Sequence, residues 1–414
     1  MKEVYSNIRG TFDFDPATSF VFRKVEQIAL KIFKIFAYEE VILPVLEEKD
    51  LFIKGVGRST DIVERQMFKI ESKDIVLRPE GTAQVVRYYL QNSLYKQSDF
   101  HKFFYIGPMF RGERPQKGRL RQFHHIGAEA IGSDSIYLDA EIISLSLAIL
   151  NTVGIKEYDL KINTLGCVRD RDEFSRYIKK SLADNKKNFC EDCVRRLENN
   201  PLRILDCKNT QCRRIVDSLS TENSCLCESC SRKFKDLLAL LRDLNIKFMH
   251  VPFLVRGLDY YTNTVFEIAS ASLGSQDAIG AGGRYNNLIK SLGGPDIPAI
   301  GFALGVERML LLLDNTNDRP RVDVFMAASS SSIANVAFKI TNKLRQEGIS
   351  SDCDYTDKSL KGQLRLSQKY KARYVVIVGE EELKENSIIL KDMQSSTQEK
   401  IAINNLIVSL KNKI

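Results

Sequence analysis

A short polar segment that ends in proline separates two patterns in this chain of 414 residues. The segment Asp314-Asn-Thr-Asn-Asp-Arg-Pro320 is typical of a linker. After it, apolar segments typical of strands alternate with helical segments over residues 322–378, which predicts a small α/β domain with a largely parallel or mixed sheet. Before it, strand-like segments dominate. The chain is therefore expected to fold as two or three domains, as its length also indicates.

A second change of pattern interrupts the strand-rich part. From residue 167 to about residue 248 the sequence becomes helical, highly charged and rich in cysteine, and strand character then returns. Such an interruption indicates an inserted subdomain. We expect residues 1–166 and 249–318 to form one core around an insertion at 167–248, followed by a separate domain at 319–414.

Seven of the nine cysteines of the chain fall between residues 190 and 230 of the insertion. They are Cys190, Cys193, Cys207, Cys212, Cys225, Cys227 and Cys230. In a reducing compartment such clustering favours a structural zinc over disulfides. The two Cys-x-x-Cys pairs, however, are farther apart than in a compact zinc ribbon, and seven thiols exceed the needs of one site. A zinc site and incidental free thiols remain alternatives, and the sequence assigns no metal ligand.

The ends and the charge of the chain indicate its compartment and its partners. Residues 1–10 lack the continuous apolar segment of an export signal, and no membrane span of roughly 18 apolar residues is expected. The chain is therefore predicted to be soluble and intracellular. Its formal charge of +8 fits a polyanionic partner, although a merely basic soluble protein would carry the same charge.

The first fifty residues predict a helix followed by a strand. Asp15 is suited to cap a helix that has Pro16 at its first position. The segment Val41–Leu46 has the composition of a strand. Because Pro44 cannot donate a hydrogen bond to a ladder, this strand belongs at an edge of the sheet or at a subunit contact.

Four separated segments offer arginines or carboxylates that are suited to binding a triphosphate and an amino acid. They are 78–82, 110–124, 254–261 and 301–308. None contains the Gly-x-x-x-x-Gly-Lys-Ser/Thr loop, so planar guanidinium groups would hold the phosphates. Arg308 lies in an apolar segment, where a core carboxylate or a phosphate would pair with it.

Carboxylates in apolar surroundings complement these arginines. Glu129 lies in a nearly apolar strand, and a buried carboxylate needs a cationic or hydrogen-bonding partner. A substrate ammonium or imidazole would serve. The segment from Arg256 to Tyr261 adds a cation, a carboxylate and two phenols, although an internal pair of Arg256 with Asp259 is the structural alternative. No histidine has a convincing nucleophile beside it, which argues against a hydrolase.

These segments resemble the histidyl-tRNA synthetase family of class II aminoacyl-tRNA ligases over nearly the whole chain. Val41–Leu46 resembles motif 1, residues 110–124 resemble motif 2 with its loop, and residues 301–308 resemble motif 3. Residues 254–261 and 281–285 are similar to two signatures peculiar to the histidine enzyme. The resemblance implies an α+β fold, with an antiparallel-sheet catalytic core of six or seven strands, a helical insertion and a C-terminal α/β anticodon-binding domain.

The resemblance also implies an activity, its substrates and an assembly. The chain would ligate L-histidine to tRNA(His) through a histidyl-adenylate, with release of AMP and pyrophosphate. ATP would be a substrate, with Mg²⁺ on its outer phosphates. The enzyme would be a cytoplasmic homodimer that does not bind membranes.

The roles implied for individual residues follow the matching positions. The histidine-binding residues would be Glu80, Gly81, Thr82, Arg111, His125, Glu129, Arg256, Tyr260, Tyr261 and Tyr285. The ATP-binding residues would be Arg111, Arg119, Arg121 and Arg308. Arg111 and Arg256 would be catalytic, because they would stabilise charge where the histidine carboxylate attacks the α-phosphate. The tRNA-binding residues would be Gln116, Lys361, Arg365 and Lys369, although a solvated helix face also explains the last three.

One departure and three rival hypotheses accompany this interpretation. His125 stands where the family usually has a glutamine, and an imidazole lacks the paired geometry of an amide. A regulatory paralogue of the synthetase fold would be expected to lose the ATP-binding arginines and the C-terminal domain, both of which this chain keeps. The 254–261 signature disfavours a ligase for another amino acid. A nucleic-acid-binding protein would leave the central carboxylates unexplained.

Overall fold

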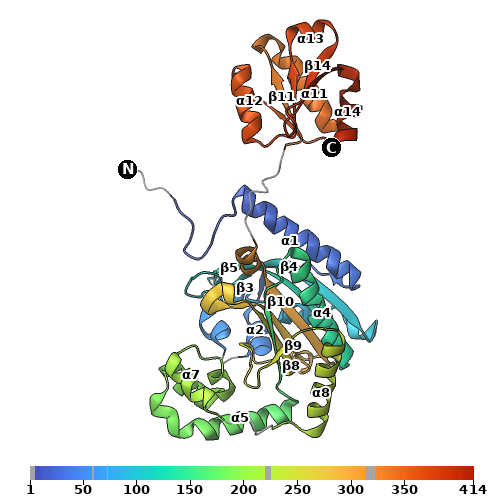
Figure 1. The fold of residues 1–414 in the computed structure, drawn as a ribbon. Helices are drawn as coiled ribbons and strands as arrows, with labels where there is room; N and C mark the ends of the chain where they lie inside the picture. Colours follow the sequence, from blue (N-terminus) through green and yellow to red (C-terminus); the bar gives the residue numbers. More distant parts are fainter. Residues whose placement is uncertain (1–4, 58–59, 72, 220–224, 314–321) are drawn as a thin grey trace. The chain divides into compact units, whose positions relative to one another are not determined.

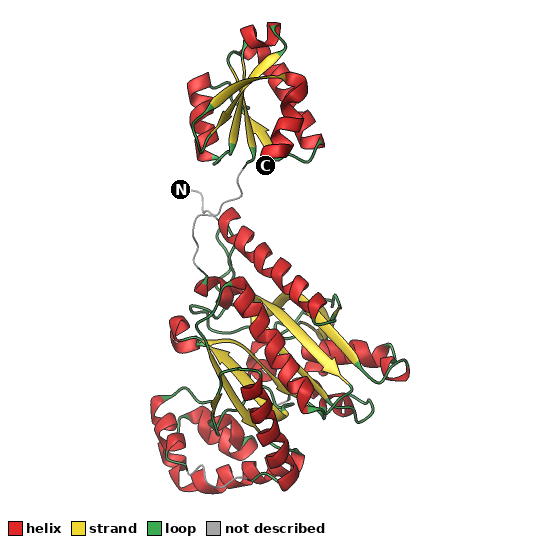
Figure 2. Cartoon of the chain, turned by 45° about the vertical axis from the view of Figure 1, so that its right-hand side comes forward, coloured by secondary structure: helices red, strands yellow, loops and turns green. Residues whose placement is uncertain are grey.

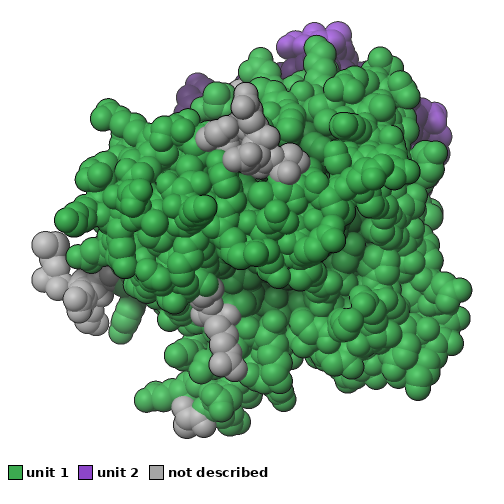
Figure 3. Space-filling view, turned by 90° about the horizontal axis from the view of Figure 1, so that it is seen from below, with its two compact units in different colours: residues 1–315 green, residues 316–414 purple. Residues whose placement is uncertain are grey.

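The computed structural model of this chain describes residues 5–57, 60–71, 73–219, 225–313 and 322–414. It contains two compact units, residues 1–315 and residues 316–414, which Figure 3 shows in different colours. Each unit has its own sheet and core. The boundary expected between residues 318 and 319 lies outside the described residues. The expected fold class is confirmed, because a large sheet rich in antiparallel pairs and a separate C-terminal α/β unit are both present.

Unit 1 is built on an eight-stranded sheet. In spatial order the strands are β1 (Glu39–Glu40), β4 (His101–Phe110), β5 (Gln122–Ile131), β10 (Ala299–Gly305), β9 (Ala278–Arg284), β8 (Thr262–Ala269), β6 (Asp159–Thr164) and β7 (Met249–His250). All neighbours are antiparallel except the two edge pairs, β1 with β4 and β6 with β7. The expectation of six or seven strands was therefore too low. The two-residue edge strands are too short to show a period of two in the sequence.

Alternation along the strands gives the sheet a core on each face. On β4, Phe104 packs into a core with the helices α1 (Pro16–Ile35), α4 (Ile136–Val153) and α8 (Glu228–Asp243) (Figure 1). Tyr105, one position on, packs into the opposite core with α2 (Lys49–Val56) and α3 (Thr82–Gln91). The helices thus cover both faces, and the residues of β4 and β5 that point toward α3 reach the candidate site.

The helix α1 begins where the sequence predicts. The side chain of Asp15 accepts a hydrogen bond of 2.7 Å from the backbone N–H of Thr18, and Pro16 occupies the first turn. This cap satisfies one of the donors left free at a helix N-terminus. It fixes the point at which the apolar stripe of α1 meets the sheet.

The helix α4 corrects the expectation that no segment is apolar enough for a membrane span. Its 18 residues have a mean hydropathy of 1.5, and 56% of them are buried inside unit 1. Such a helix passes a test of length and composition because it packs against the sheet and against neighbouring helices. It is a core helix of unit 1.

The segment Val41–Leu46 does not form the strand that the sequence predicts. β1 ends at Glu40, and β2 (Leu46–Glu48) pairs instead with β3 (Ile75–Leu77) in a separate two-stranded sheet. Between them, Val41 and Leu43 are buried while Ile42 is 89% exposed. The backbone N–H of Val41 still donates to the carbonyl of Phe104 at 2.9 Å, and the carbonyl of Val45 accepts from the backbone N–H of Arg78 at 2.9 Å, but the segment forms no strand.

The inserted residues form helices between β6 and β7. These are α5 (Val168–Leu182), α6 (Glu191–Asn199), α7 (Thr210–Asp217) and α8, and the first three lie together beyond the end of the sheet (Figures 1 and 2). Buried residues of α5, α6 and α7 join the core that contains α3, whereas Phe234, Leu237 and Leu241 of α8 join the core that contains α4. The insertion therefore packs directly on the rest of unit 1.

Unit 2 has a mixed five-stranded sheet with helices on both faces. In spatial order its strands are β12 (Ser351–Cys353), β11 (Val324–Ala328), β13 (Tyr374–Val378), β14 (Ser387–Asp392) and β15 (Gln398–Ala402). β11 is parallel to β12 and β13, and the remaining pairs are antiparallel. α11 (Ala334–Gln346) packs with Val324 and Met326, while α12 (Leu360–Lys369) packs with Phe325 and Ala327 on the other face.

Candidate active site

A cleft of about 580 Å³ in unit 1 gathers residues from all four segments singled out in the sequence. The predicted residues that line it are Glu80, Thr82, Arg111, Arg119, His125, Arg256, Tyr260, Tyr261, Tyr285 and Arg308. They lie on β5 and α10 (Val306–Leu312), at the start of α3, directly after β4 and β9, and in other connections between the elements. The tertiary structure thus brings together side chains that are more than 200 positions apart in the sequence, as with Glu80 and Arg308.

The arginines of the cleft repel one another. The pKa of Arg308 is lowered to about 10, first by burial and then by the charges of Arg111, Arg119 and Arg256. The pKa of Arg111 is also lowered, with burial as the largest cause. Such an accumulation of positive charge in a concave, partly dehydrated site is unfavourable unless an anion binds there.

Arg111 and Arg308 are held by neutral groups. Arg111 follows the last residue of β4, donates from Nε to the carbonyl of Pro79 at 3.0 Å, and places its guanidinium 5.2 Å from the ring centroid of Phe123. Arg308 donates to the carbonyls of Gly118 and Ala278. Within the described ranges neither has an ion pair, so the expected alternative of a core carboxylate for Arg308 is not what the structure shows. Both retain full positive charge for a ligand.

Arg119 and Arg256 each have a carboxylate partner. Arg119 pairs with Glu113 of the same loop, and Arg256 pairs with Glu267 on β8. The predicted alternative partner of Arg256, Asp259, instead accepts a hydrogen bond from Asn200. The Nε atom of Arg256 is buried and has no hydrogen-bond partner among the described residues. That donor is available to a ligand in the cleft.

Glu129 lies at the centre of a buried group of hydroxyls. Its carboxylate accepts hydrogen bonds from Thr82 at 2.7 Å, from Tyr285 at 2.6 Å and from Tyr105 at 3.4 Å. Burial nevertheless raises the pKa of Glu129 to about 8, and the nearby charge of Glu80 adds to the effect. Glu129 is not among the residues that line the cleft, and it lies behind Thr82, Tyr105 and Tyr285, which are.

Two glycines create the space for this group. A Cβ atom on Gly301 of β10 would overlap the carboxylate of Glu129, its pairing partner on β5. A Cβ atom on Gly81 would overlap the ring of Tyr105. Glycine at these positions lets the backbone approach the site closely. Gly81, which is predicted to bind histidine and directly precedes α3, thus leaves room for the ring of Tyr105.

Glu80 lines the cleft and also caps a helix. Its two carboxylate oxygens accept hydrogen bonds from the backbone N–H groups of Thr82 at 2.7 Å and Ala83 at 3.0 Å, at the start of α3. Burial raises its pKa, and these hydrogen bonds together with the charge of Arg111 oppose that rise. The helix N-terminus therefore orients the carboxylate, which forms no ion pair with any of the described residues.

His125 occupies the cleft as a neutral imidazole. Burial, followed by the charges of Arg111 and Arg308, holds its pKa well below the usual range. Its ring lies 5.0 Å from that of Phe123, edge to face. Its Nδ1 atom is buried without a hydrogen-bond partner within the described part of the chain. A polar atom left in this state points to a partner supplied by a ligand.

The remaining predicted residues lie outside the lining of the cleft. Arg121 donates from Nε to the carbonyl of Glu113 at 3.3 Å and does not reach the cleft, so the structure does not place it at an ATP site. Gln116 is exposed at the tip of the motif 2 loop, in a tight turn closed by backbone hydrogen bonds with Arg119. Lys361, Arg365 and Lys369 are exposed at four-residue spacing on α12 of unit 2.

Sequence reasoning missed three residues that organise the site. Tyr105 reaches Glu129, and its position two residues beyond the pairing partner of Glu129 on β4 would have placed it on the same face. Glu307 accepts hydrogen bonds from the backbone N–H and the Nδ1 of His124, which joins motif 3 to motif 2. Glu267 holds Arg256, and no sequence signal connects the two.

Comparisons with known proteins match both units of the chain. The family model described as histidyl-tRNA synthetase matches residues 10–309, and the model of an anticodon binding domain matches residues 323–413. Histidine–tRNA ligase of Halothermothrix orenii is 43% identical over 408 residues, which cover 96% of this chain and 97% of the relative. That of Syntrophomonas wolfei is 41% identical and covers 98% of each chain.

Solved structures show the same architecture. Apo histidyl-tRNA synthetase of S. aureus superposes with a TM-score of 0.80 at 33% identity, covering 99% of this chain and 100% of that one. A Bacillus halodurans protein described as an ATP phosphoribosyltransferase regulatory subunit/histidyl-tRNA synthetase has a TM-score of 0.66 at 20% identity, a likeness of fold alone. From the match over residues 10–309, the identities above 40% and the shared fold, we conclude that this chain belongs to the histidyl-tRNA synthetase family, which attaches histidine to tRNA(His) at the expense of ATP.

Proposed function

We propose that the cleft of unit 1 is where this chain joins L-histidine to ATP and then transfers histidine to tRNA(His). The observation that carries the assignment is the convergence of Arg111, Arg256 and Arg308 on one cleft beside the buried Glu129 group. The arginines of the cleft outnumber the carboxylates that pair with them, so they are suited to binding a triphosphate. The buried carboxyl of Glu129 and the phenols around it are suited to binding an imidazole. Together the two halves of the cleft fit ATP and histidine side by side.

The Glu129 group is assigned to the imidazole of histidine. The rings of Tyr260 and Tyr261 are tilted by 49° with centroids 4.7 Å apart, and Tyr260 meets the ring of Tyr285 edge to face at 5.7 Å. These rings exclude water around Glu129 and Tyr285, so hydrogen bonds to an imidazole would be made at low dielectric. A pocket that hydrogen-bonds both ring nitrogens rejects analogues that leave its polar groups unpaired by roughly 10⁴-fold.

The arginines are assigned to ATP and to the reacting carboxylate. Arg111 holds the α-phosphate and Arg308 holds the γ-phosphate, since both guanidinium groups lack an anionic partner among the described residues. Arg256 donates its free Nε toward the histidine carboxylate or the α-phosphate while Glu267 fixes its orientation. Glu80, oriented by α3, receives the α-ammonium of histidine. Arg121 is left out of this assignment because it does not line the cleft.

The reaction needs orientation more than proton transfer. A carboxylate oxygen of histidine attacks the α-phosphorus, and the bond to the bridging oxygen of pyrophosphate breaks. The arginines neutralise charge on the five-coordinate phosphorus, and bound substrates are held in line. Three guanidinium groups without a dedicated general base suit this step. Glu129 and the tyrosines take no part in bond making.

Magnesium would accompany ATP in this site. Mg²⁺ prefers oxygen ligands and usually binds through substrate phosphates with one or two carboxylates. Glu113, Glu267 and Glu307 line the cleft, so the required donor chemistry is present. When bound, the ion neutralises charge on the outer phosphates, which supplements the arginines.

Unit 2 is assigned to the anticodon stem-loop of tRNA(His). Lys361, Arg365 and Lys369 form one exposed stripe on α12, and no ion pair within the described residues involves them. A cleft of about 770 Å³ lies at the carboxyl ends of β11 and β12, where exposed Phe338 and Tyr355 contribute aromatic surface. Cations for phosphates and rings for unstacked bases match single-stranded RNA. Gln116 is assigned to the acceptor end.

The assembly is proposed to be a cytoplasmic homodimer. Support comes from the extended segment after β1, where Ile42 is 89% exposed between buried neighbours. A second copy that packs against this segment would cover the apolar side chain of Ile42. Sedimentation equilibrium of the wild type and of Ile42→Glu tests this directly. A dimer that the substitution splits supports the assignment, and a wild-type monomer rejects it.

ATP–pyrophosphate exchange with each of the twenty amino acids tests the activity itself. Stimulation by histidine alone, followed by charging of tRNA(His) with radiolabelled histidine, is the expected result. Exchange with no amino acid, from protein shown to be folded, would instead favour a regulatory role. Exchange with a different amino acid would refute the assignment of the Glu129 group.

A further inference from the structure

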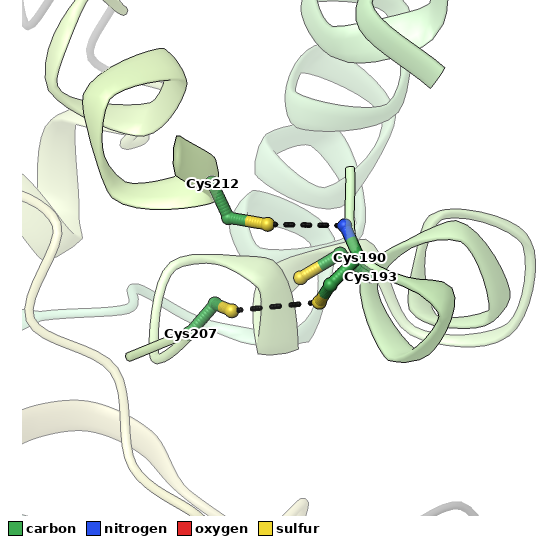
Figure 4. A group of neighbouring side chains, drawn as sticks. All are labelled: Cys190, Cys193, Cys207 and Cys212. Carbon is green, nitrogen blue, oxygen red and sulfur yellow. Dashed lines mark hydrogen bonds between the residues drawn. The ribbon is translucent and has the colours of Figure 1, made fainter. Parts of the chain in front are cut away.

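The insertion contains a group of four thiols that the catalytic assignment does not use. The Sγ atoms of Cys190, Cys193, Cys207 and Cys212 all lie within 4.8 Å of one another, and three of these residues are buried (Figure 4). The Sγ atoms of Cys190 and Cys207 are 3.9 Å apart. Four sulfurs at the usual Zn–S bond length of about 2.3 Å would be roughly 3.8 Å apart in a tetrahedron. We propose that these four cysteines bind one structural Zn²⁺.

Local structure directs the thiols toward one point. Cys190 is the N-cap of α6 and Cys193 lies one turn into that helix, so the Cys-x-x-Cys spacing puts both sulfurs at its N-terminus. Cys212 lies in the first turn of α7, whose N-cap is Asn209. A helix N-terminus favours the thiolate, which is the form that binds a metal. Cys207 completes the set from the connection before α7.

Two features around the cluster suit thiolates that are bound to a metal. The backbone N–H of Cys190 donates to the Sγ of Cys212 at 3.3 Å, the kind of hydrogen bond that orients metal ligands. Arg196, on the next turn of α6, interacts electrostatically with Cys193 and Cys207. Its cation would offset part of the negative charge of a zinc with four thiolates. If the four cysteines were free thiols, neither the hydrogen bond to the Sγ of Cys212 nor the cation of Arg196 would be needed.

A second group of ligands has the same construction at the base of the insertion. One ligand atom from each of Cys167, Asp170, Cys227 and Cys230 lies within 4.8 Å of the others. Cys167 caps α5 and Cys227 caps α8, each with a second ligand three residues later. Here the first and last helices of the insertion meet. Three thiolates and a carboxylate form a second zinc site, although Asp170 also accepts a hydrogen bond from the backbone N–H of Cys167 at 3.3 Å.

This arrangement removes both objections that the sequence raised. The first Cys-x-x-Cys pair joins Cys207 and Cys212, and the second joins Cys167, which lies outside the seven-cysteine stretch. The two pairs therefore belong to different sites, and their separation is not a span that one ion must bridge. Cys225 belongs to neither group. The number of thiols matches two sites and one remaining cysteine.

The first site also has a place in the proposed function. Cys190 and Cys207 line the catalytic cleft, together with Arg196 and Asn209 from the same subdomain. A zinc at this point would fix the wall that α6 and α7 form opposite the motif 3 residues. This consequence depends on the proposed function, whereas the presence of the metal does not. Metal content and activity can therefore fail separately.

Zinc content measured by mass spectrometry on the full-length purified chain tests the sites. Two zinc ions per chain are expected for the wild type and for Cys225→Ser, the matched control. One ion is expected for Cys193→Ser and one for Cys230→Ser. A wild type with one ion that only Cys193→Ser removes retains the first site and refutes the second. The reverse pattern retains the second and refutes the first, and a wild type without zinc refutes both.

A measurement on the unmodified chain covers the case in which a variant does not fold. Titration with p-hydroxymercuribenzoate should release zinc to a chromophoric chelator as the thiols react, in proportion to the cysteines modified. Cobalt exchanged into the wild type should give intense thiolate-to-metal absorption with the visible bands of a tetrahedral ion. Absorption typical of octahedral oxygen ligands, or zinc that stays bound after all the thiols have been modified, would refute cysteine ligation.

Discussion

The hydroxyl of Tyr285 donates a hydrogen bond of 2.6 Å to Glu129, a carboxyl that burial drives toward its neutral form. The two residues lie 156 positions apart and meet only because β9 and β10 bring the end of one signature against β5. The carboxyl of Glu129 can therefore hold a proton inside the proposed histidine pocket, and a cationic ligand would favour its release. Its behaviour with pH gives the first prediction.

Wild-type stability should fall relative to Glu129→Gln as the pH rises from about 5 to 8. The pKa of Glu129 is raised from 4.5 to about 8, so the folded chain retains a proton that the unfolded chain releases in this window. The stabilising contribution is complete below the unfolded value and is lost as the pH passes the folded value. Urea unfolding at four pH values across this window should show that the unfolding free energy of the wild type, relative to Glu129→Gln, falls by about 4 kcal/mol. Saturating histidine should reduce it, and parallel curves would contradict the raised pKa.

Arg256→Ala should lower ATP–pyrophosphate exchange by at least about 100-fold, because an oriented donor at the reacting phosphate typically contributes that much. The fold should survive, since Glu267 retains Lys161 at 3.7 Å as a second cation. Arg87→Ala is the control, because Arg87 also pairs with a glutamate, Glu47, at 2.9 Å but does not line the cleft. Rapid-quench measurement of adenylate formation separates chemistry from binding. A loss confined to the KM for histidine would reject the catalytic role.

His125→Gln should retain exchange within about threefold. The imidazole is neutral across the working pH range because burial and two arginines hold its pKa well below the usual range. An uncharged amide therefore replaces an uncharged ring, and it can hydrogen-bond the same ligand. The acid limb of the pH profile should not move. A shift of that limb on substitution would show that His125 titrates in the wild type.

Replacement of Lys361, Arg365 and Lys369 by alanine should raise the KM for tRNA(His) by roughly tenfold and leave exchange unchanged. Cations that bind phosphates release counterions, so the salt dependence of tRNA binding should also weaken, by up to about one unit of log–log slope for each phosphate that is no longer neutralised. Lys339→Ala with Lys343→Ala, which removes two cations from α11 on the opposite face of the sheet, is the control, and the two variants are compared per charge removed. Equal effects per charge removed in both variants would show that tRNA binding depends on the net charge of the unit and not on these three positions.

Much of the fold and of the site could be predicted because the signals are local. Asp15 with Pro16 fixed the start of α1, the basic loop lay between β4 and β5 as expected, and the arginines of the matching segments lie in one cleft. The edge strands could not be predicted, because two residues show no period. Arg121, expected at the ATP site, does not line the cleft, and its Nε donates to the carbonyl of Glu113, a contact that the sequence does not indicate.

The sequence by itself determined the family, the order of the domains and the residue types that each segment brings to the reaction. Periodicity, caps and short signatures depend on neighbouring residues, so they can be read along the chain. Only the tertiary structure decided the pairings: Glu129 with Tyr105 and Tyr285, Arg256 with Glu267, and Cys167 with the cysteines of α8. These pairings join residues that lie from about ten to more than a hundred positions apart. Their identities follow from sheet register and helix packing, which no local pattern encodes.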